Sequence, residues 1–81
     1  MAKKVNKKRK IHKLSVVVFD KERCPQDVWE NYYKVQFSGK AFVYMGEIPQ
    51  MPGHCVLINV DTGIAMIHET ENFRLATQDE L

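Results

Sequence analysis

"HCVLINVDTGIAMIHE", residues 54–69, decides the fold of this 81-residue chain. Two runs rich in β-branched and apolar residues flank Asp61-Thr62-Gly63, a pattern typical of a β-hairpin whose loop ends in a left-handed glycine. If Val60 opposes Ile64, alternation gives one face to His54, Val56, Ile58, Val60, Ile64, Met66 and His68. The other face then carries Cys55, Leu57, Asn59, Ala65, Ile67 and Glu69.

Further strands are predicted on both sides of this hairpin. Residues 13–22 (KLSVVVFDKE) are apolar, β-branched and bounded by charges, and residues 41–48 (AFVYMGEI) form a second such run. Gly46 interrupts that second run near its end, which favours a bulge or bend there. A short last strand is expected over residues 74–76, after a single 3₁₀ turn at residues 70–73.

The segment PQMPG, residues 49–53, predicts a turn rather than a reactive loop. Pro49 and Pro52 have no amide proton, so ladder pairing must stop at both positions. Pro52-Gly53 suits the two central positions of a type II turn, because the second of them requires a positive φ. Met51 lies at the tip of this loop, either folded onto the core or exposed as a contact residue.

Residues 24–37 (CPQDVWENYYKVQF) fit two structures. Pro25 suits the first position of a helix, and the spacing of Val28, Tyr32 and Val35 is amphipathic. The alternation of Tyr33, Val35 and Phe37 fits a strand equally well. We expect a short helix from Pro25 to about Tyr33, followed by a strand from about Lys34.

Length and composition indicate one small globular domain. The apolar and charged fractions are 44% and 27%, which is ordinary for a folded domain. No apolar run is long enough to span a bilayer or to serve as a secretory signal, so a cytoplasmic protein is expected. Cys24 and Cys55 are then expected to be free thiols.

Charge is distributed unevenly along the chain. The first 13 residues hold seven of the 12 basic residues and no acidic one, so a segment of net +7 precedes a body of net −5. Within residues 1–10 Val5 is the only β-branched apolar residue, so residues 1–13 are expected to be a disordered tail, followed by one domain over residues 14–81. It is either a solubilising tail or an arm that binds nucleic acid through Lys3, Lys4, Lys7, Lys8, Arg9, Lys10 and Lys13.

The patterns for catalysis and metal binding are weak. His54 and Cys55 are adjacent on a strand and point to opposite faces, so one zinc ion would not readily bind both. No C-x₂₋₄-C or H-x₃₋₅-H spacing occurs, and SGK (residues 38–40) lacks the other glycine of a phosphate-binding loop. We expect no enzymatic activity, no cofactor and no metal.

The predicted order of strands, with a 3₁₀ turn before a short closing strand, resembles the SH3-like small β-barrels. The resemblance covers residues 14–76 and implies a small barrel of about five antiparallel strands with one short helix or helical turn. The acidic first loop and ALYDY-like motif of peptide-binding SH3 domains are absent from this sequence. Recognition of proline-rich peptides is therefore not expected.

The sequence favours a non-catalytic interaction module that docks on a larger protein or complex. The residues expected to contact a protein partner are Trp29, Tyr32, Tyr33, Ile48 and Met51, because aromatic residues and methionine are enriched at protein interfaces. The alternative is a protein associated with RNA or DNA through its basic N-terminal tail.

Overall fold

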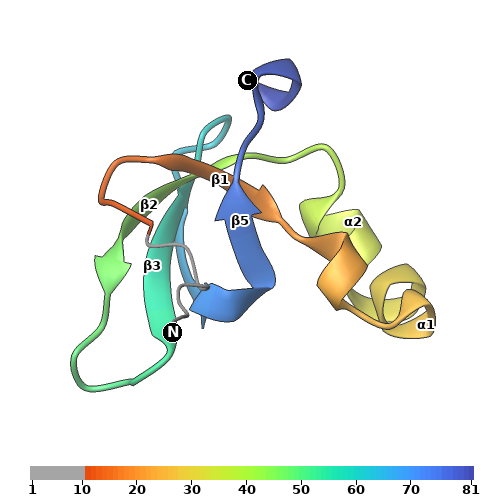
Figure 1. Cartoon of the computed structure of the whole chain (residues 1–81), viewed down its shortest axis with the longest axis horizontal. Helices are drawn as coiled ribbons and strands as arrows, with labels where there is room; N and C mark the ends of the chain where they lie inside the picture. Colours follow the sequence, from red (N-terminus) through yellow and green to blue (C-terminus); the bar gives the residue numbers. More distant parts are fainter. Residues whose placement is uncertain (1–10) are drawn as a thin grey trace, which may run out of the picture.

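The computed structural model describes residues 11–81, which form one antiparallel sheet and one helical segment (Figure 1). The strands are β1 (Val16–Phe19), β2 (Phe42–Glu47), β3 (His54–Asn59), β4 (Ala65–Glu69) and β5 (Phe73–Leu75). They form one five-stranded sheet in the order β4-β3-β2-β1-β5. The prediction of a mainly β protein with about five antiparallel strands is confirmed.

The predicted closure of the strands into a barrel is wrong. β4 and β5 lie at opposite ends of the strand order, and no ladder joins them within residues 11–81. The expected 3₁₀ turn, η4 (Thr70–Asn72), connects them. Thr70 N–H still bonds Gly53 next to β3, whereas the Asn72 carbonyl already accepts from Asp20 next to β1. The chain therefore crosses from one end of the sheet to the other, and the three-residue β5 pairs with β1 alone.

The β3–β4 hairpin is present, but its register differs from the prediction by one residue. Asn59, rather than Val60, bonds Ile64, with its N–H 3.0 Å from the carbonyl oxygen. Leu57 accordingly pairs with Met66. A slip of one residue changes which side chains share a face. The inner face of the hairpin therefore combines Cys55 and Leu57 with Met66 and His68, and the outer face combines Val56 and Ile58 with Ala65 and Ile67.

The side chain of Asn59 explains the slip. Its Oδ1 accepts hydrogen bonds from Asp61 N–H and Thr62 N–H, at 2.8 and 3.1 Å. Asparagine side chains form such turns with the backbone that follows them. Val60 N–H instead bonds the carbonyl that precedes β2, at 3.0 Å. The loop therefore begins at Val60 and ends at Gly63, whose φ is +74°.

The β2–β3 connection confirms the predicted turn at Pro52-Gly53. His54 N–H bonds the Met51 carbonyl at 3.0 Å, and Gly53 has a φ of +82°. A positive φ at the third residue is the requirement of a type II turn.

The bulge predicted at Gly46 is also confirmed. The register between β2 and β3 shifts between Tyr44 and Glu47. Gly46 has a φ of +113°, which a residue with a side chain rarely adopts.

The helix begins near its predicted start but continues past its predicted end. α1 (Gln26–Val28), the π-helical turn η3 (Trp29–Tyr33) and α2 (Lys34–Phe37) follow one another without a break. The strand predicted from Lys34 is absent. A strand would place Val35 and Phe37 on the same face, whereas the helix directs their side chains to different sides. Phe37 is 2% exposed and joins the core, whereas Val35 is 90% exposed.

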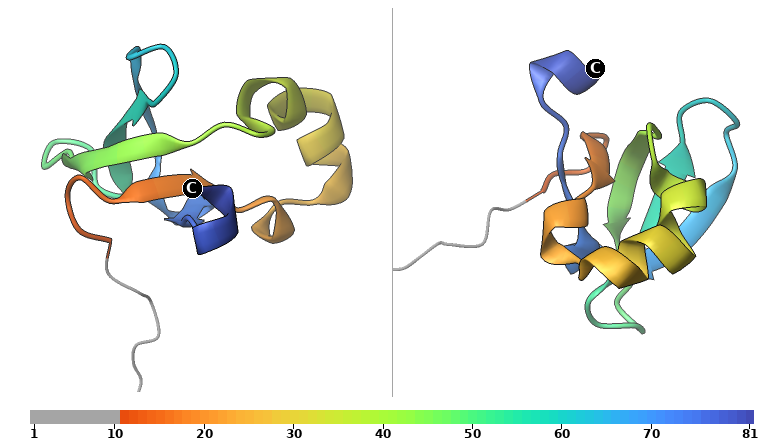
Figure 2. Two further views of the ribbon diagram at one scale, coloured as in Figure 1. Left: turned by 90° about the horizontal axis from the view of Figure 1, so that it is seen from above. Right: turned by 90° about the vertical axis from the view of Figure 1, so that its right-hand side faces the viewer.

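The core lies between the inner face of the sheet and the helical segment, which Figure 2 (right) shows in front of the sheet. Phe19 is at its centre, stacked on Phe37 with ring centroids 4.7 Å apart and edge-on to Phe73 at 5.5 Å. Such aromatic pairs stabilise a core beyond their buried area. The buried residues are Val17, Phe19, Trp29, Phe37, Phe42, Tyr44, Cys55, Leu57 and Phe73.

Candidate functional site

The outward side chains of β2, β3 and β4 form an apolar surface, here called the outer face. The register aligns Val43, Ile58 and Ala65 in one row across the three strands. Val56 and Ile67 form the next row, and Ile67 is 52% exposed. The apolar residues of the outer face are Val43, Met45, Val56, Ile58, Ala65 and Ile67. The exposed carboxylate of Glu69, paired with His54, lies at the end of this surface on β4.

The two faces of the sheet have different environments. Trp29 and Phe37 of the helical segment pack in the core beneath the inner face. The outer face contacts solvent although it is built from β-branched and other apolar side chains. Soluble monomers rarely expose large contiguous apolar patches, and such patches mark interaction surfaces.

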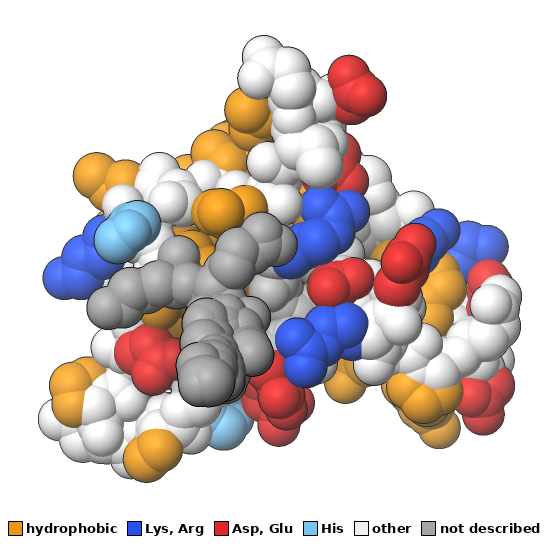
Figure 3. Space-filling model, in the orientation of Figure 1, with side chains coloured by type: hydrophobic (Ala, Val, Ile, Leu, Met, Phe, Trp, Pro, Cys, Tyr) orange, Lys and Arg blue, Asp and Glu red, His pale blue; other side chains and the backbone are white. Residues whose placement is uncertain are grey.

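A groove of about 980 Å³ lies between β5, η4 and the ends of β2 and β3. Tyr44 and Phe73 contribute to its apolar lining, and four carboxylates also line it: Asp20, Glu47, Glu69 and Glu71. Arg74 and Arg23 are each 3.9 Å from one of these acids. Figure 3 shows acidic and basic side chains side by side on this face. The charges are therefore partly compensated within the protein.

The thiol nearest this groove belongs to the core. Cys55 is 0% exposed, and burial raises the pKa of its thiol, an effect that the Thr70 hydroxyl partly opposes. Thr70 Oγ1 is buried and has no conventional hydrogen-bond partner within residues 11–81. Burial, together with the charge of Glu47, also raises the pKa of Tyr44. Because the thiolate is the reactive form of cysteine, this environment does not activate Cys55.

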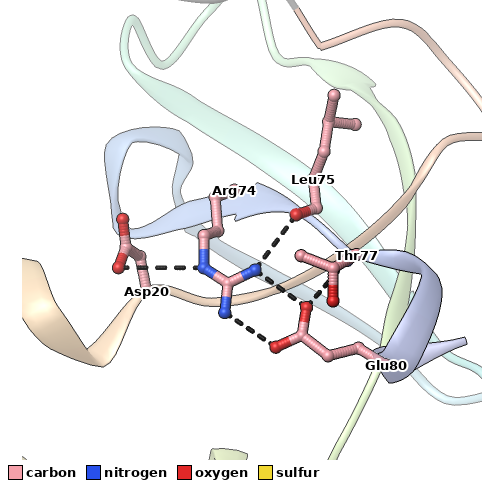
Figure 4. A network of polar contacts seen from close by, with 5 residues as sticks. All are labelled: Asp20, Arg74, Leu75, Thr77 and Glu80. Carbon is pink, nitrogen blue, oxygen red and sulfur yellow. Dashed lines mark hydrogen bonds and ion pairs between the residues drawn. The ribbon is translucent and has the colours of Figure 1, made fainter.

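A bidentate ion pair fixes the C-terminal turn η5 (Gln78–Glu80) to β5 (Figure 4). Arg74 Nη1 and Nη2 donate to Glu80 Oε1 and Oε2 at 2.8 and 2.7 Å. Glu80 Oε1 also accepts from Thr77 N–H at 2.8 Å, completing a capping box. Paired, charge-assisted hydrogen bonds of this kind are among the stronger ones in proteins.

This ion pair predicts a strongly acidic Glu80. Hydrogen bonds from Arg74 and from Thr77 N–H lower the pKa of Glu80 from 4.5 to about 2. A carboxyl group whose pKa is lower in the folded than in the unfolded state stabilises the folded state at pH values above its ordinary pKa. The contribution of this contact should therefore decrease as the pH falls from about 4.5 and be lost below about 2. NMR titration of the Glu80 side-chain carboxyl carbon measures the midpoint directly.

Arg74→Ala should raise the Glu80 midpoint toward the ordinary range of a glutamate, short of it by the effect of the remaining bond from Thr77 N–H. Lys34→Ala is the matched control, because it removes a separate exposed ion pair with Glu30, of 3.2 Å. The control should leave the Glu80 midpoint unchanged. An ordinary midpoint in the unmodified protein would contradict the bidentate contact.

The residues predicted to bind protein do not form one surface. Trp29 is buried and Tyr33 packs against the core, while Tyr32 is 72% exposed. Ile48 and Met51 belong to the β2–β3 turn, which Figure 1 shows at the opposite end of the long axis from the helical segment.

The residues predicted to bind nucleic acid lie mostly outside the described part of the chain. Lys3, Lys4, Lys7, Lys8, Arg9 and Lys10 precede residue 11. Lys13 is exposed, and its side chain passes beside Gly46. The predicted disorder of the tail likewise concerns residues that the structure does not describe, apart from residues 11–13.

Sequence reasoning missed the outer face because it assigned the wrong register to the hairpin. It placed Val56 and Ile58 on one face and Ala65 and Ile67 on the other. The signal that corrects this assignment is Asn59, whose side chain favours starting the turn one residue earlier.

No family model matches the sequence, and comparison with curated proteins and with solved structures finds no match. Within residues 11–81 no helix is sufficiently long and apolar to cross a bilayer. The same residues contain no group of three or more histidine, cysteine or acidic side chains arranged to bind a metal ion.

Proposed function

We propose that this protein is a non-catalytic docking module whose outer face binds a larger protein. The observation that supports the proposal is the apolar surface that spans β2, β3 and β4. We also propose that the fold belongs to the SH3-like class and that the protein is cytoplasmic. The 3₁₀ turn before the short β5 supports the first of these. A fold of this kind hosts many unrelated functions, so the docking role rests on the outer face.

The most exposed residues of the outer face are its expected anchors. Ile67 is 52% and Met45 36% exposed, so both have apolar surface left to bury in a complex. Burial of apolar area contributes about 25 cal/mol per Å², and the centre of an interface is usually depleted of charge. Trp29, by contrast, is already buried in the core, and Tyr33 is partly buried against it.

Site-specific photo-crosslinking in a lysate of the native host tests the proposal. A photoreactive residue in place of Met45 should give one discrete adduct larger than twice the 9.4 kDa chain. The same probe in place of Gln36, an exposed helical residue, is the matched control and should give none. Adding Val56→Lys should suppress the Met45 adduct, because it introduces a charge into the outer face. Equal labelling from both probe positions, or none from Met45, would refute the proposal.

The second candidate function is association with nucleic acid, supported by the net charge of +7 in residues 1–13. Fluorescence anisotropy with a mixed-sequence RNA compares the full chain with a variant in which those seven basic residues are glutamine. If the second candidate is right, only the unmodified chain binds and its affinity falls steeply with salt. If the chain is only a docking module, neither protein binds RNA near physiological salt.

A further inference from the structure

We propose that the open edge of β4 pairs with β4 of a second copy of this chain, in an antiparallel dimer centred on Ile67. The inference concerns the backbone at the edge of the sheet, whereas the proposed function concerns side chains of the outer face. The two can therefore fail independently.

Two hydrogen bonds establish which residues of β4 bond to β3. Asn59 N–H donates to the Ile64 carbonyl at 3.0 Å, and at the other end Thr70 N–H donates to the Gly53 carbonyl at 2.8 Å. In an antiparallel pair, residues that exchange hydrogen bonds alternate with residues that do not. The even-numbered residues of β4 therefore direct their backbone groups toward β3.

The odd-numbered residues of β4 direct their N–H and C=O groups away from the sheet. These residues are Ala65, Ile67 and Glu69. β4 is an edge strand of the sheet, with β3 as its one neighbour in the strand order. Glu69 N–H donates to Nδ1 of the neighbouring His68 at 2.9 Å. No backbone group from another segment of residues 11–81 bonds to these three residues. The edge thus presents an evenly spaced row of donors and acceptors, which an extended strand would satisfy.

β4 has few of the features with which proteins protect such an edge, and its one charged side chain, Glu69, lies at its end. It contains no lysine and no proline, and its pairing with β3 runs through five consecutive residue pairs without a bulge. Lysine, proline and bulges are the usual means of preventing edge pairing. β5, the opposite edge, is three residues long, and the ion pair of Arg74 with Glu80 holds η5 beside it. Within residues 11–81, β4 is therefore the edge suited to strand addition.

The partner we infer is a second copy because β4 is complementary to itself. The three outward-bonding residues are symmetric about Ile67. A two-fold axis at Ile67 pairs that residue with its equivalent and each Ala65 with Glu69 of the other copy. About four hydrogen bonds form in this pairing while Glu69 N–H keeps its bond to His68. Centring on Glu69 would instead oppose two carboxylates, which is unfavourable. The same arrangement joins the two outer faces into one surface through contact between the Ile67 side chains.

Cysteine cross-linking tests the register. In a Cys24→Ser background, Ile67→Cys would place two cysteines in a hydrogen-bonded pair with Cα atoms about 5.5 Å apart, within the range of a disulfide. Ala65→Cys is the matched control, because two such residues would be roughly 14 Å apart along the paired strands. Mild oxidation should give a covalent dimer with Ile67→Cys and little with Ala65→Cys. Equal cross-linking of both variants, or of neither, would overturn the proposed register.

Sedimentation equilibrium tests the association itself. The average mass of the unmodified protein should rise with concentration toward twice 9.4 kDa and no further, because the pairing uses one edge per copy. Ile67→Lys should remain monomeric with an unchanged circular dichroism spectrum, since residue 67 is half exposed and lysine protects strand edges. Val35→Lys, at a 90% exposed helical position, is the control and should still dimerise. A chain that stays monomeric at millimolar concentration, or that forms larger species, contradicts the dimer.

Discussion

Replacing Phe37 with alanine is expected to lower the free energy of unfolding by about 3–5 kcal/mol. Phe37 is 2% exposed, and its ring stacks on Phe19 at 4.7 Å and contacts His68 edge-on at 5.2 Å. Removing the ring leaves a cavity where the helical segment meets the sheet. A domain of this length has a total stability of about 4–12 kcal/mol, so the variant should lose a large share of its stability and unfold at a much lower urea concentration.

Urea unfolding followed by circular dichroism measures the loss. Val35→Ala is the matched control, because it truncates a 90% exposed side chain two residues away in the same helix. Its effect should stay within about 0.5 kcal/mol. Comparable losses from the two variants would indicate that Val35 and Phe37 share a buried face, as in a strand, and would contradict the helix.

Replacing Gly46 with alanine should destabilise the protein by about 2 kcal/mol, through strain in the backbone. Gly46 has a φ of +113°, beyond the left-handed helical region that other residues occasionally adopt. A Cβ atom there would also lie 2.9 Å from Lys13 Cε. The lysine side chain is flexible and can move away, so the backbone accounts for most of the loss. Thermal or urea unfolding measures it.

Two variants make this second prediction specific. Gly39→Ala should cost less, about 1 kcal/mol, because Gly39 has a φ of +70° and a Cβ added there would meet no atom within 4 Å. Combining Lys13→Ala with Gly46→Ala removes most of the side chain that crowds the new Cβ. If the combination restores stability, the contact with Lys13 is responsible and the backbone argument is wrong.

The features that sequence predicted correctly depend on short-range chemistry. The turn at Pro52-Gly53 and the bulge at Gly46 follow from the conformations that proline and glycine allow. The hairpin was recognisable from its two β-rich runs, but its register depended on the Asn59 side chain, which competes for the backbone of the loop. Residues 34–37 satisfied both a helical and a strand pattern, and only packing of Phe37 distinguishes them.

The candidate site was less predictable than the fold. The outer face exists only in the observed register, so an error of one residue concealed it. Trp29 and Tyr33 were expected at an interface, but aromatic residues are favoured both in cores and at interfaces, and here both pack in or against the core. Closure of a barrel depends on how distant sheet edges meet, which no local pattern reports.

The π-helical turn η3 has a consequence for how this protein tolerates changes in length. Residues seven apart in a regular α-helix point in directions only about 20° apart, whereas Trp29 and Phe37 are eight apart and both are buried. The wider turn between them accommodates the additional residue. A chain with one residue fewer in η3 would form a regular helix and still direct both rings into the core. A deletion of one residue within the helical segment is therefore most easily accommodated at this turn.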